Sequence, residues 1–405
     1  MEDLEAIVAD AQALVAQRAW GAAGIAWARV AAVAMEAGRR DTARSAWDAA
    51  GESWRRDDRV DSAARALTMA LGLAERERAV ALAQVKLAGV LGELGRLTDA
   101  ESLCARAYAA CPPDDPLRAV VVDTWVNARL ALGQRDRCNE LVDELAVLPD
   151  SAQLAARFRR AQLLRQDGAL GAAVPALESL MESLQGDARL LPALAGARAE
   201  LGEVELLRGE HARAVSLLEQ AFAEQAEAGR RSLQLRAEAA RVRVLLERGL
   251  PALVHGLDDG LAYAQERGLV LLECDVRVAR GMALAERAPE RARADLERAV
   301  QLADAAGSEP RSGRARYEWA ALASDTLERR LSILKRATVQ LASSRPWAVR
   351  CDLLRARLIA EASPDEALDL ARAAHSQFVM MDMRLDAALG DSLVRTLAAR
   401  NSPPV

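Results

Sequence analysis

The apolar positions of the chain follow the spacing of α-helices, and short turns interrupt them at a regular interval. In one early segment, apolar residues stand at Ala43, Ala46, Trp47, Ala50 and Trp54, which is the spacing of one helical face. Most of the turns consist of a glycine and a polar residue, and a small residue follows about five positions later. We expect each of these small residues to lie in the first turn of a new helix.

The interval between turns predicts the architecture. From Asp58 onward the turns recur at a nearly constant interval of about 38 residues, a period typical of repeat proteins. The first step, from Gly38 to Asp58, is only about half as long. A full unit accommodates two helices of about 15 residues and two short turns. The pattern predicts an all-α fold, an α-α superhelix of nine to ten antiparallel helical hairpins, or about twenty helices.

The chain has no Gly/Ser linker and no low-complexity tract, so we expect one continuous solenoid. An N-terminal helix or cap is expected over residues 1–21 and the helical repeats over 22–375. Residues 376–405 are expected to form a C-terminal capping helix and a short disordered tail.

The composition supports closely packed helices. Hydrophobic residues make up 51% of the chain but aromatic residues only 3%, and the apolar mass is mainly Ala, Leu and Val. Ala and Leu are strong helix formers, and a core of small residues lets helices cross closely. With three Phe and three Tyr, a large β-sheet is not expected.

Three segments carry the residues by which the chain resembles tetratricopeptide repeats, in a variant with long helices. In residues 81–114 the matching positions are a Leu-Gly-like pair, a turn glycine, two small residues at the helix crossings and a terminating proline, namely Leu87, Ala88, Gly95, Ala100, Ala107 and Pro112. Residues 195–228 match through Leu201, Gly202, Gly209, Ala214 and Ala221, and residues 24–57 through Trp27, Gly38, Ala43, Trp47 and Ala50. The resemblance implies a solenoid whose first helix in each hairpin lines a concave groove.

The charge balance bears on partners and location. The net charge is −5, and no third of the chain is strongly basic, which argues against nucleic acid as the main partner. No apolar window of about 18 residues predicts a membrane span. The N-terminus is acidic, unlike a signal peptide. Five scattered cysteines without a C-x-x-C motif indicate buried thiols in a reducing cytosol, so we expect a cytoplasmic protein.

Candidate chemistry is sparse. The three histidines, His211, His255 and His375, lie far apart in the repeat register. The sequence contains no H-E-x-x-H motif, no metal-spaced Cys/His cluster and no phosphate-binding P-loop. We therefore predict no enzymatic activity, no cofactor and no metal site.

The concave groove is the candidate binding site. Reading the inward faces by their distance from the turns selects eight residues that we expect to contact a partner: Asn127, Phe158, Gln162, Arg165, Arg236, Arg243, Arg316 and Trp319. By the resemblance, Asn127 stands where peptide-clamping members of the family hold a ligand backbone. Asp123 occupies a position where such members carry a basic residue, so a full carboxylate clamp is not expected.

Four arginines of this groove have two readings. Arg165, Arg236, Arg243 and Arg316 are suited to an acidic or phosphorylated segment of a partner. Alternatively, they pair with neighbouring carboxylates of the chain itself, such as Glu203 or Glu247.

Two apolar clusters also have two readings each. Trp20, Trp27, Trp47 and Trp54 are expected to pack between helices, and an exposed Trp54 would instead mark a contact with a partner or a second copy. The run from Phe378 to Met383 is expected to pack a terminal helix or to form a Met-rich contact surface.

The sequence thus predicts a non-enzymatic scaffold that binds a protein or peptide partner in its groove, with self-association left open. The alternative is a regulatory sensor in which a small ligand or signalling peptide changes the shape of the superhelix.

Overall fold

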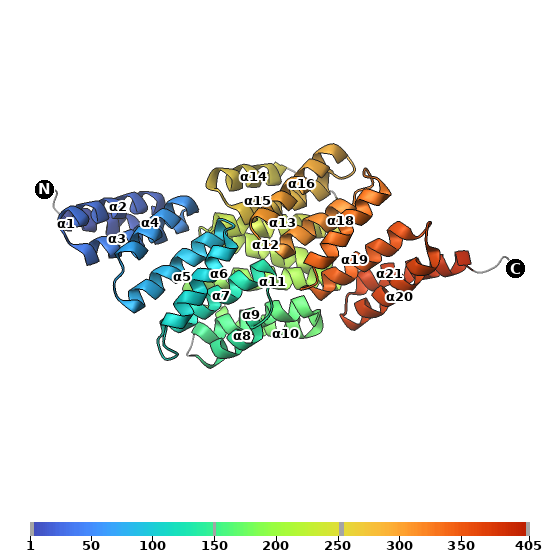
Figure 1. The fold of residues 1–405 in the computed structure, drawn as a ribbon, viewed down its shortest axis with the longest axis horizontal. Coiled ribbons are helices and arrows are strands. Elements are labelled where there is room, and N and C mark those ends of the chain that lie inside the picture. Colours follow the sequence, from blue (N-terminus) through green and yellow to red (C-terminus); the bar gives the residue numbers. More distant parts are fainter. Residues whose placement is uncertain (1–3, 149–150, 251–254, 402–405) are drawn as a thin grey trace.

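The computed structural model describes residues 4–148, 151–250 and 255–401, and this part of the chain folds into twenty-one α-helices and one 3-10 helix (Figure 1). In chain order the helices are α1 (Leu4–Ala16), α2 (Trp20–Glu36), α3 (Arg40–Arg56), α4 (Val60–Leu73), α5 (Glu77–Glu93), α6 (Leu97–Ala110), α7 (Leu117–Leu132), α8 (Cys138–Val147), α9 (Ser151–Asp167), α10 (Leu170–Leu184), η1 (Ala188–Leu190), α11 (Leu191–Arg208), α12 (His211–Glu227), α13 (Arg231–Glu247), α14 (His255–Arg267), α15 (Val270–Leu284), α16 (Pro289–Ala305), α17 (Glu309–Ala321), α18 (Leu327–Gln340), α19 (Arg345–Ile359), α20 (Pro364–Met380) and α21 (Arg384–Asn401). The predicted all-α superhelix is confirmed. Its twenty-one α-helices within the described residues are one more than the twenty helices of ten hairpins.

The turns form as the sequence pattern predicts. Gly209 ends α11 with a φ of 84°, and its backbone N–H donates to the carbonyl oxygens of Glu205 and Leu206. A left-handed residue at this position satisfies carbonyl groups that the helix end leaves open, and glycine adopts it without a Cβ penalty. Asp58 takes the same left-handed conformation, with a φ of 55°, in the turn between α3 and α4. The short first step from Gly38 to Asp58 is one helix, α3, and its turn.

Small residues bring the two helices of a hairpin together. Gly202 of α11 faces Leu218 of α12, and a Cβ at Gly202 would lie 2.8 Å from the Leu218 Cγ. Ala214 and Ala221 on α12 are fully buried. The low aromatic content therefore has a packing reason, since these crossings leave no room for larger side chains.

The helices form two layers. Each helix contacts the next in the chain, and the odd-numbered helices from α5 to α21 also contact the next odd-numbered helix. These odd-numbered helices make the inner layer of the superhelix, as expected for the first helices of the hairpins.

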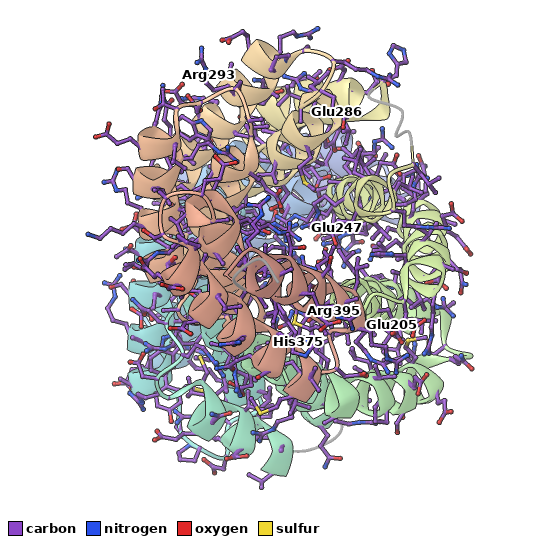
Figure 2. All side chains as sticks on the ribbon, turned by 90° about the vertical axis from the view of Figure 1, so that its right-hand side faces the viewer. Glu205, Glu247, Glu286, Arg293, His375 and Arg395 are labelled. Atoms are coloured by element: carbon purple, nitrogen blue, oxygen red, sulfur yellow. The ribbon has the colours of Figure 1, made fainter. Side chains whose placement is uncertain are left out.

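Successive turns of the superhelix touch each other. Polar contacts join residues 174 to 177 positions apart, among them Arg208 with Asp382 and Ser308 with the Ala131 carbonyl. In the same way, α7 contacts α17, and α9 contacts α19. One superhelical turn therefore takes about 175 residues, between four and five hairpins. The termini lie at opposite ends of the long axis (Figure 1), and a view along that axis shows helices around a centre near which Glu247 lies (Figure 2).

The ends differ in detail from the expected segments. Helix α2 begins at Trp20, inside the segment 1–21, and α20 runs across the boundary expected at residue 376. The last helix, α21, begins at Arg384. The tail expected to be disordered falls largely on residues 402–405, which lie outside the described residues.

Candidate functional site

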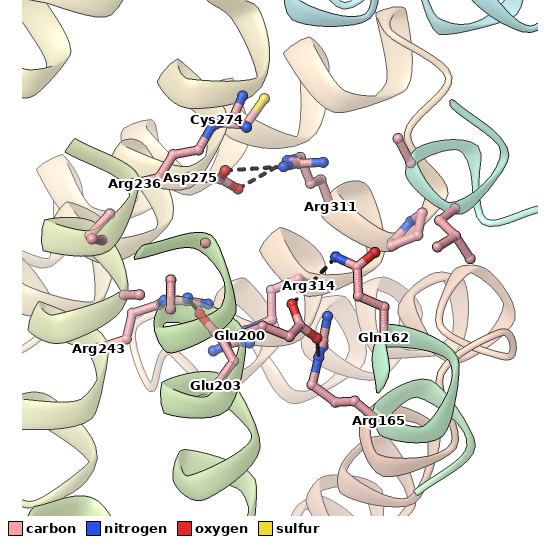
Figure 3. A pocket seen from close by; sticks show the side chains of 18 of the residues that line it. Gln162, Arg165, Glu200, Glu203, Arg236, Arg243, Cys274, Asp275, Arg311 and Arg314 are labelled. Atoms are coloured by element: carbon pink, nitrogen blue, oxygen red, sulfur yellow. Dashed lines mark hydrogen bonds and ion pairs between the residues drawn. The ribbon is translucent and has the colours of Figure 1, made fainter. Parts of the chain in front are cut away.

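A pocket with a volume of about 460 Å³ lies inside the superhelix. Its walls come from the inner helices α7, α9, α11, α13, α15, α17 and α19, with a contribution from α12. Figure 3 shows side chains from several of these helices directed toward one shared space. The volume falls within the range of pockets that hold small ligands, roughly 300–1,000 Å³.

Ion pairs between neighbouring repeats organise the inner layer. Arg159 on α9 donates to Asp123 on α7 at 2.7 Å, and Arg165 on α9 donates to Glu200 on α11 at 2.5 Å. The partners are 36 and 35 residues apart, one repeat, so each pair ties an inner helix to the next.

The same arrangement continues toward the C-terminal half. Arg243 on α13 pairs with Glu203 on α11. Arg311 on α17 donates from Nε and Nη2 to the two oxygens of Asp275 on α15, at 3.0 and 3.2 Å. Such bidentate pairs use the planar guanidinium that lysine lacks. The chain has only two lysines, and at these positions its many arginines have a structural use.

The electrostatics show which arginines are compensated. Burial lowers the pKa of Arg165 and of Arg243, but the carboxylates around them outweigh burial and raise both pKa values. The carboxylates that raise the pKa of Arg165 are Glu200 and Glu203. Among the carboxylates around Arg243, Glu203 raises its pKa most. Two other arginines of the pocket behave differently: burial dominates and lowers the pKa of Arg236 and that of Arg314.

Five of the eight predicted groove residues line this pocket, namely Asn127, Gln162, Arg165, Arg236 and Arg243. Some of their side chains are held by other residues of the inner layer. The Asn127 Oδ1 accepts from Arg159 at 3.0 Å, and Gln162 donates to Glu200 at 3.4 Å. The alternative in which the groove arginines pair with internal carboxylates holds for Arg165, for Arg243 through the predicted Glu203, and for Arg316 through Asp304.

The other three predicted residues do not line this pocket. Phe158 packs against core side chains beside α10. Arg316 is 6% exposed and is held by Asp304 and Gln340. Trp319 is 8% exposed in a core cluster, where its indole N–H donates to Asp325 at 2.9 Å. On α17, the pocket is lined instead by Pro310, Arg311 and Arg314.

The pocket residues that the sequence reasoning missed carry a simple signal. Asp275 and Arg314 stand seven positions after Gly268 and Gly307, as the predicted Arg236 does after Gly229, and these glycines follow one another at equal intervals of one repeat. All three glycines have positive φ in the turn before an inner helix. Counting from the turn that directly precedes each inner helix therefore finds Asp275 and Arg314. Scanning for opposite charges one repeat apart finds Glu200 and Arg311.

The cysteine thiols are buried. All five cysteines are free and buried, as the sequence predicts. Burial raises the pKa of Cys104, Cys274 and Cys351 to about 12 in each case. Such thiols are not poised for nucleophilic chemistry. Burial also lowers the pKa of His211, and His375 contacts the Ala387 carbonyl oxygen through Nδ1 at 3.0 Å.

The two apolar clusters pack mainly inside the fold. Trp27 and Trp47 pack against a core cluster of the first helices, and Trp54, half-buried, fills the space that Gly24 leaves open. In the C-terminal run, Phe378 is fully buried whereas Met380 is 67% exposed. Within the described residues, no helix combines the length and apolarity needed to cross a membrane.

No protein-family model and no curated protein matches the sequence. Among solved structures, a Rap protein complexed with Competence and Sporulation Factor matches with a TM-score of 0.50 and 12% identity, over 79% of this chain and 98% of that chain. The apo form of RapI matches with a TM-score of 0.40 and 10% identity, over 79% and 99% of the two chains. A STAND protein with a tetratricopeptide repeat sensor from Pyrococcus horikoshii gives 0.40 and 14%, over 91% and 52%.

At such identities the likeness concerns the fold. The helical hairpins, their regular spacing along the chain and the superhelix that they build are those of a tetratricopeptide-like solenoid, which confirms the resemblance seen in the sequence.

Proposed function

We propose that this tetratricopeptide-like superhelix is a non-enzymatic binding protein that holds a short segment of a protein or peptide partner in its inner pocket. The observation that carries the proposal is a pocket of about 460 Å³ whose walls come from seven consecutive inner helices. Ion pairs between repeats fix these walls. The entropic cost of becoming ordered on binding therefore falls mainly on the partner. A protein of this fold is known with a bound factor, in the Rap complex. The expected cytoplasmic location stays a prediction.

A glycine in the pocket wall offers a direct test. Gly196 on α11 lines the pocket, and a Cβ there would have open space around it. Phenylalanine at this position would project into the pocket without disturbing the helix, since glycine is a weaker helix former than phenylalanine. We expect Gly196→Phe to fold with an unchanged or higher thermal midpoint and to lose its ligands.

The measurement is enrichment of sequences from a phage-displayed library of random short peptides. We expect the unaltered protein to enrich a sequence family and Gly196→Phe to retain less than a tenth of that binding. The matched control is Gly171→Phe, because Gly171 is an exposed glycine of α10 outside the pocket lining and also has open space around it. Equal enrichment by the Gly196→Phe and unaltered proteins, or none by the latter, would contradict the proposal.

A second candidate function is a sensor whose ligand changes the pitch of the superhelix. It is favoured by a contact between superhelical turns at Asp58, which is 5% exposed. Its carboxylate accepts hydrogen bonds from the backbone N–H of Ser232 at 3.0 Å, the Ser232 hydroxyl at 2.9 Å and the Tyr263 hydroxyl at 2.8 Å. One side chain thus joins the turn after α3 to α13 and α14.

Removal of this carboxylate is expected to loosen the superhelix. Asp58→Ala leaves three donors without an acceptor, at a cost of about 1–3 kcal/mol. We expect a larger radius of gyration in small-angle X-ray scattering. Asp41→Ala, at an exposed position in the first turn of α3, serves as the control and should leave the radius unchanged. An Asp58→Ala protein with the scattering curve of the unaltered chain would remove the support for a pitch-dependent sensor.

A further inference from the structure

Positive charge exceeds negative charge inside the pocket. Five arginines line it, namely Arg165, Arg236, Arg243, Arg311 and Arg314, against three carboxylates, Glu200, Glu203 and Asp275. Four of the arginine side chains are only 12–26% exposed, so solvent screens their charges less than at an open surface. A surplus of two cations in such a space is costly unless something else compensates it.

Each of the three carboxylates already has a partner from a neighbouring repeat. Arg165 holds Glu200, Arg243 holds Glu203, and Arg311 takes both oxygens of Asp275. These pairs account for three of the five arginines and leave Arg236 and Arg314.

Arg236 is the less compensated of these two remaining arginines. Within the described residues, its Nε is buried and has no hydrogen-bond partner. Asp275 lies one repeat further along the chain and would be its natural partner, but Arg311 occupies that carboxylate. The pKa of Arg236 is lowered by burial first and by the charge of Arg311 second. Its guanidinium therefore lacks the close anion that the three paired arginines have.

Arg314 is only partly satisfied. Its Nε donates to Glu318 at 3.0 Å, and its guanidinium lies 3.5 Å from the centre of the Trp347 ring. Within the described ranges, its buried Nη2 has no hydrogen-bond partner, and the closest Glu247 oxygen is 4.0 Å from it. The stacking on Trp347 fixes the guanidinium plane, which prepares it for a directed contact with an anion.

The two arginines occupy equivalent positions of two repeats. Each stands seven residues after a turn glycine, Gly229 or Gly307, and Asp275 holds the same position in the repeat between them. The same site of three consecutive repeats thus carries a cation, an anion and a cation. The central anion is already occupied by Arg311, so the position as a whole presents positive charge to the pocket.

We propose that the pocket selects an acidic ligand, with one carboxylate or phosphate group bound by Arg236 and with Arg314 as the second positive contact. The proposal rests on the proposed function and names the chemistry that the same pocket recognises. A planar guanidinium with free N–H groups matches the oxygens of either anion, and the pairing is strengthened by low solvent access. The three ion pairs between repeats hold the walls and are not displaced.

The proposal predicts opposite effects of Arg236→Gln on ligand affinity and on thermal stability. Arg236→Gln removes a half-buried cation whose Nε is buried without a partner and that has no close anion, so the ligand-free protein is expected to keep or raise its thermal midpoint. Affinity for an acidic ligand is expected to fall at least tenfold. A residue with a purely structural role would show the reverse, a lower midpoint with unchanged affinity. Arg241→Gln is the matched control on the same helix, because Arg241 pairs with Glu238 and does not line the pocket.

The experiment titrates unaltered, Arg236→Gln, Arg314→Gln and Arg241→Gln proteins with inorganic phosphate and with succinate, by calorimetry at constant ionic strength. Binding by the unaltered and Arg241→Gln proteins that weakens at least tenfold in Arg236→Gln supports the proposal. A preference for phosphate or for succinate identifies which anion the pocket takes. Absence of binding of both probes to the unaltered protein, or equal affinity in Arg236→Gln, overturns the proposal.

Peptide selection separates this failure from failure of the binding function. Enriched peptides without acidic groups, lost in Gly196→Phe but retained in Arg236→Gln, would overturn the anion subsite and leave the proposed function intact. Enriched peptides with acidic residues, lost in both variants, support both. Failure of the unaltered protein to enrich any peptide would contradict the binding function itself, whatever the titrations give.

Discussion

Replacement of Arg350 by methionine is expected to destabilise the C-terminal hairpins by about 3–5 kcal/mol. Arg350 lies on α19, is 6% exposed and donates to Asp386 of α21 at 3.1 and 2.8 Å. It also reaches Glu247 at the end of α13 at 3.4 Å. Burial lowers the pKa of Arg350, but Glu247 and Asp386 outweigh it and raise the pKa well above its ordinary value. Loss of the guanidinium leaves Asp386 without its paired cation and leaves Glu247 with Arg314 at 4.0 Å.

The same helix supplies the control. Arg355 pairs with Glu366 at 2.6 Å, but both side chains are about half exposed, 52% and 50%. Such a pair contributes less than about 1 kcal/mol, so Arg355→Met is expected to be nearly neutral. The measurement is urea unfolding together with amide hydrogen exchange of α20 and α21, since repeats of a solenoid open locally. A similar loss in both variants would show that burial of the Arg350 cluster is not what stabilises this end.

A second large effect is expected at Gly95, where a turn meets the next superhelical turn. Gly95 follows α5 with a φ of 76°, and a Cβ there would lie 2.9 Å from the Val270 Cγ1 and 3.2 Å from the Ala306 Cβ. Gly38 follows α2 with a φ of 68° and has nothing near its Cβ position. Both alanine variants carry the left-handed penalty of about 1–2 kcal/mol. Only Gly95→Ala adds overpacking, for a further loss of about 1–3 kcal/mol.

The comparison of these two glycines isolates the contact between superhelical turns. We expect Gly95→Ala to unfold at lower urea concentration than Gly38→Ala and to speed hydrogen exchange around Val270. Exchange around Val270 should be unchanged in Gly38→Ala. If the two variants lose equal stability, the contact between the turn after α5 and the start of α15 contributes nothing measurable and the superhelix is held by neighbouring repeats alone.

The fold could be predicted because its signals are local. A helix face such as Ala43, Ala46 and Ala50 depends on residues a few positions apart, and a turn such as Gly209 depends on one φ angle. The interval between turns then fixes the number of hairpins. The start of α21 at Arg384 was less predictable, because the turn before it has Asp382 at positive φ and no glycine.

The pocket could be predicted only in part. On α9 and α13 the count from the turn places Gln162, Arg165, Arg236 and Arg243 correctly on the inner face. On α17 the relevant turn is Gly307, next to the helix start, and a count from more distant turns rotates Arg316 and Trp319 into the groove although both are buried. A helix turns by about 100° per residue, so a small error in its start reverses the face.

The sequence alone does not show which arginine pairs with which carboxylate, because the pairing depends on how closely neighbouring repeats approach each other. Arg311 and Asp275 are 36 residues apart, and nothing local to either residue shows that they meet. The contact of Asp58 with Ser232, 174 residues away, depends on the pitch of the whole superhelix. Which arginine remains without an anion follows from these long-range pairings and not from composition.

The contacts between superhelical turns also restrict how such a protein evolves. An open solenoid tolerates gain or loss of a whole repeat, because each unit touches only its neighbours. Here an inserted hairpin between Ala131 and Ser308 would move every later residue one unit past its partner in the turn below. The contacts between superhelical turns therefore constrain the number of hairpins per turn. Duplication is compatible with the present contacts only at the two ends of the chain.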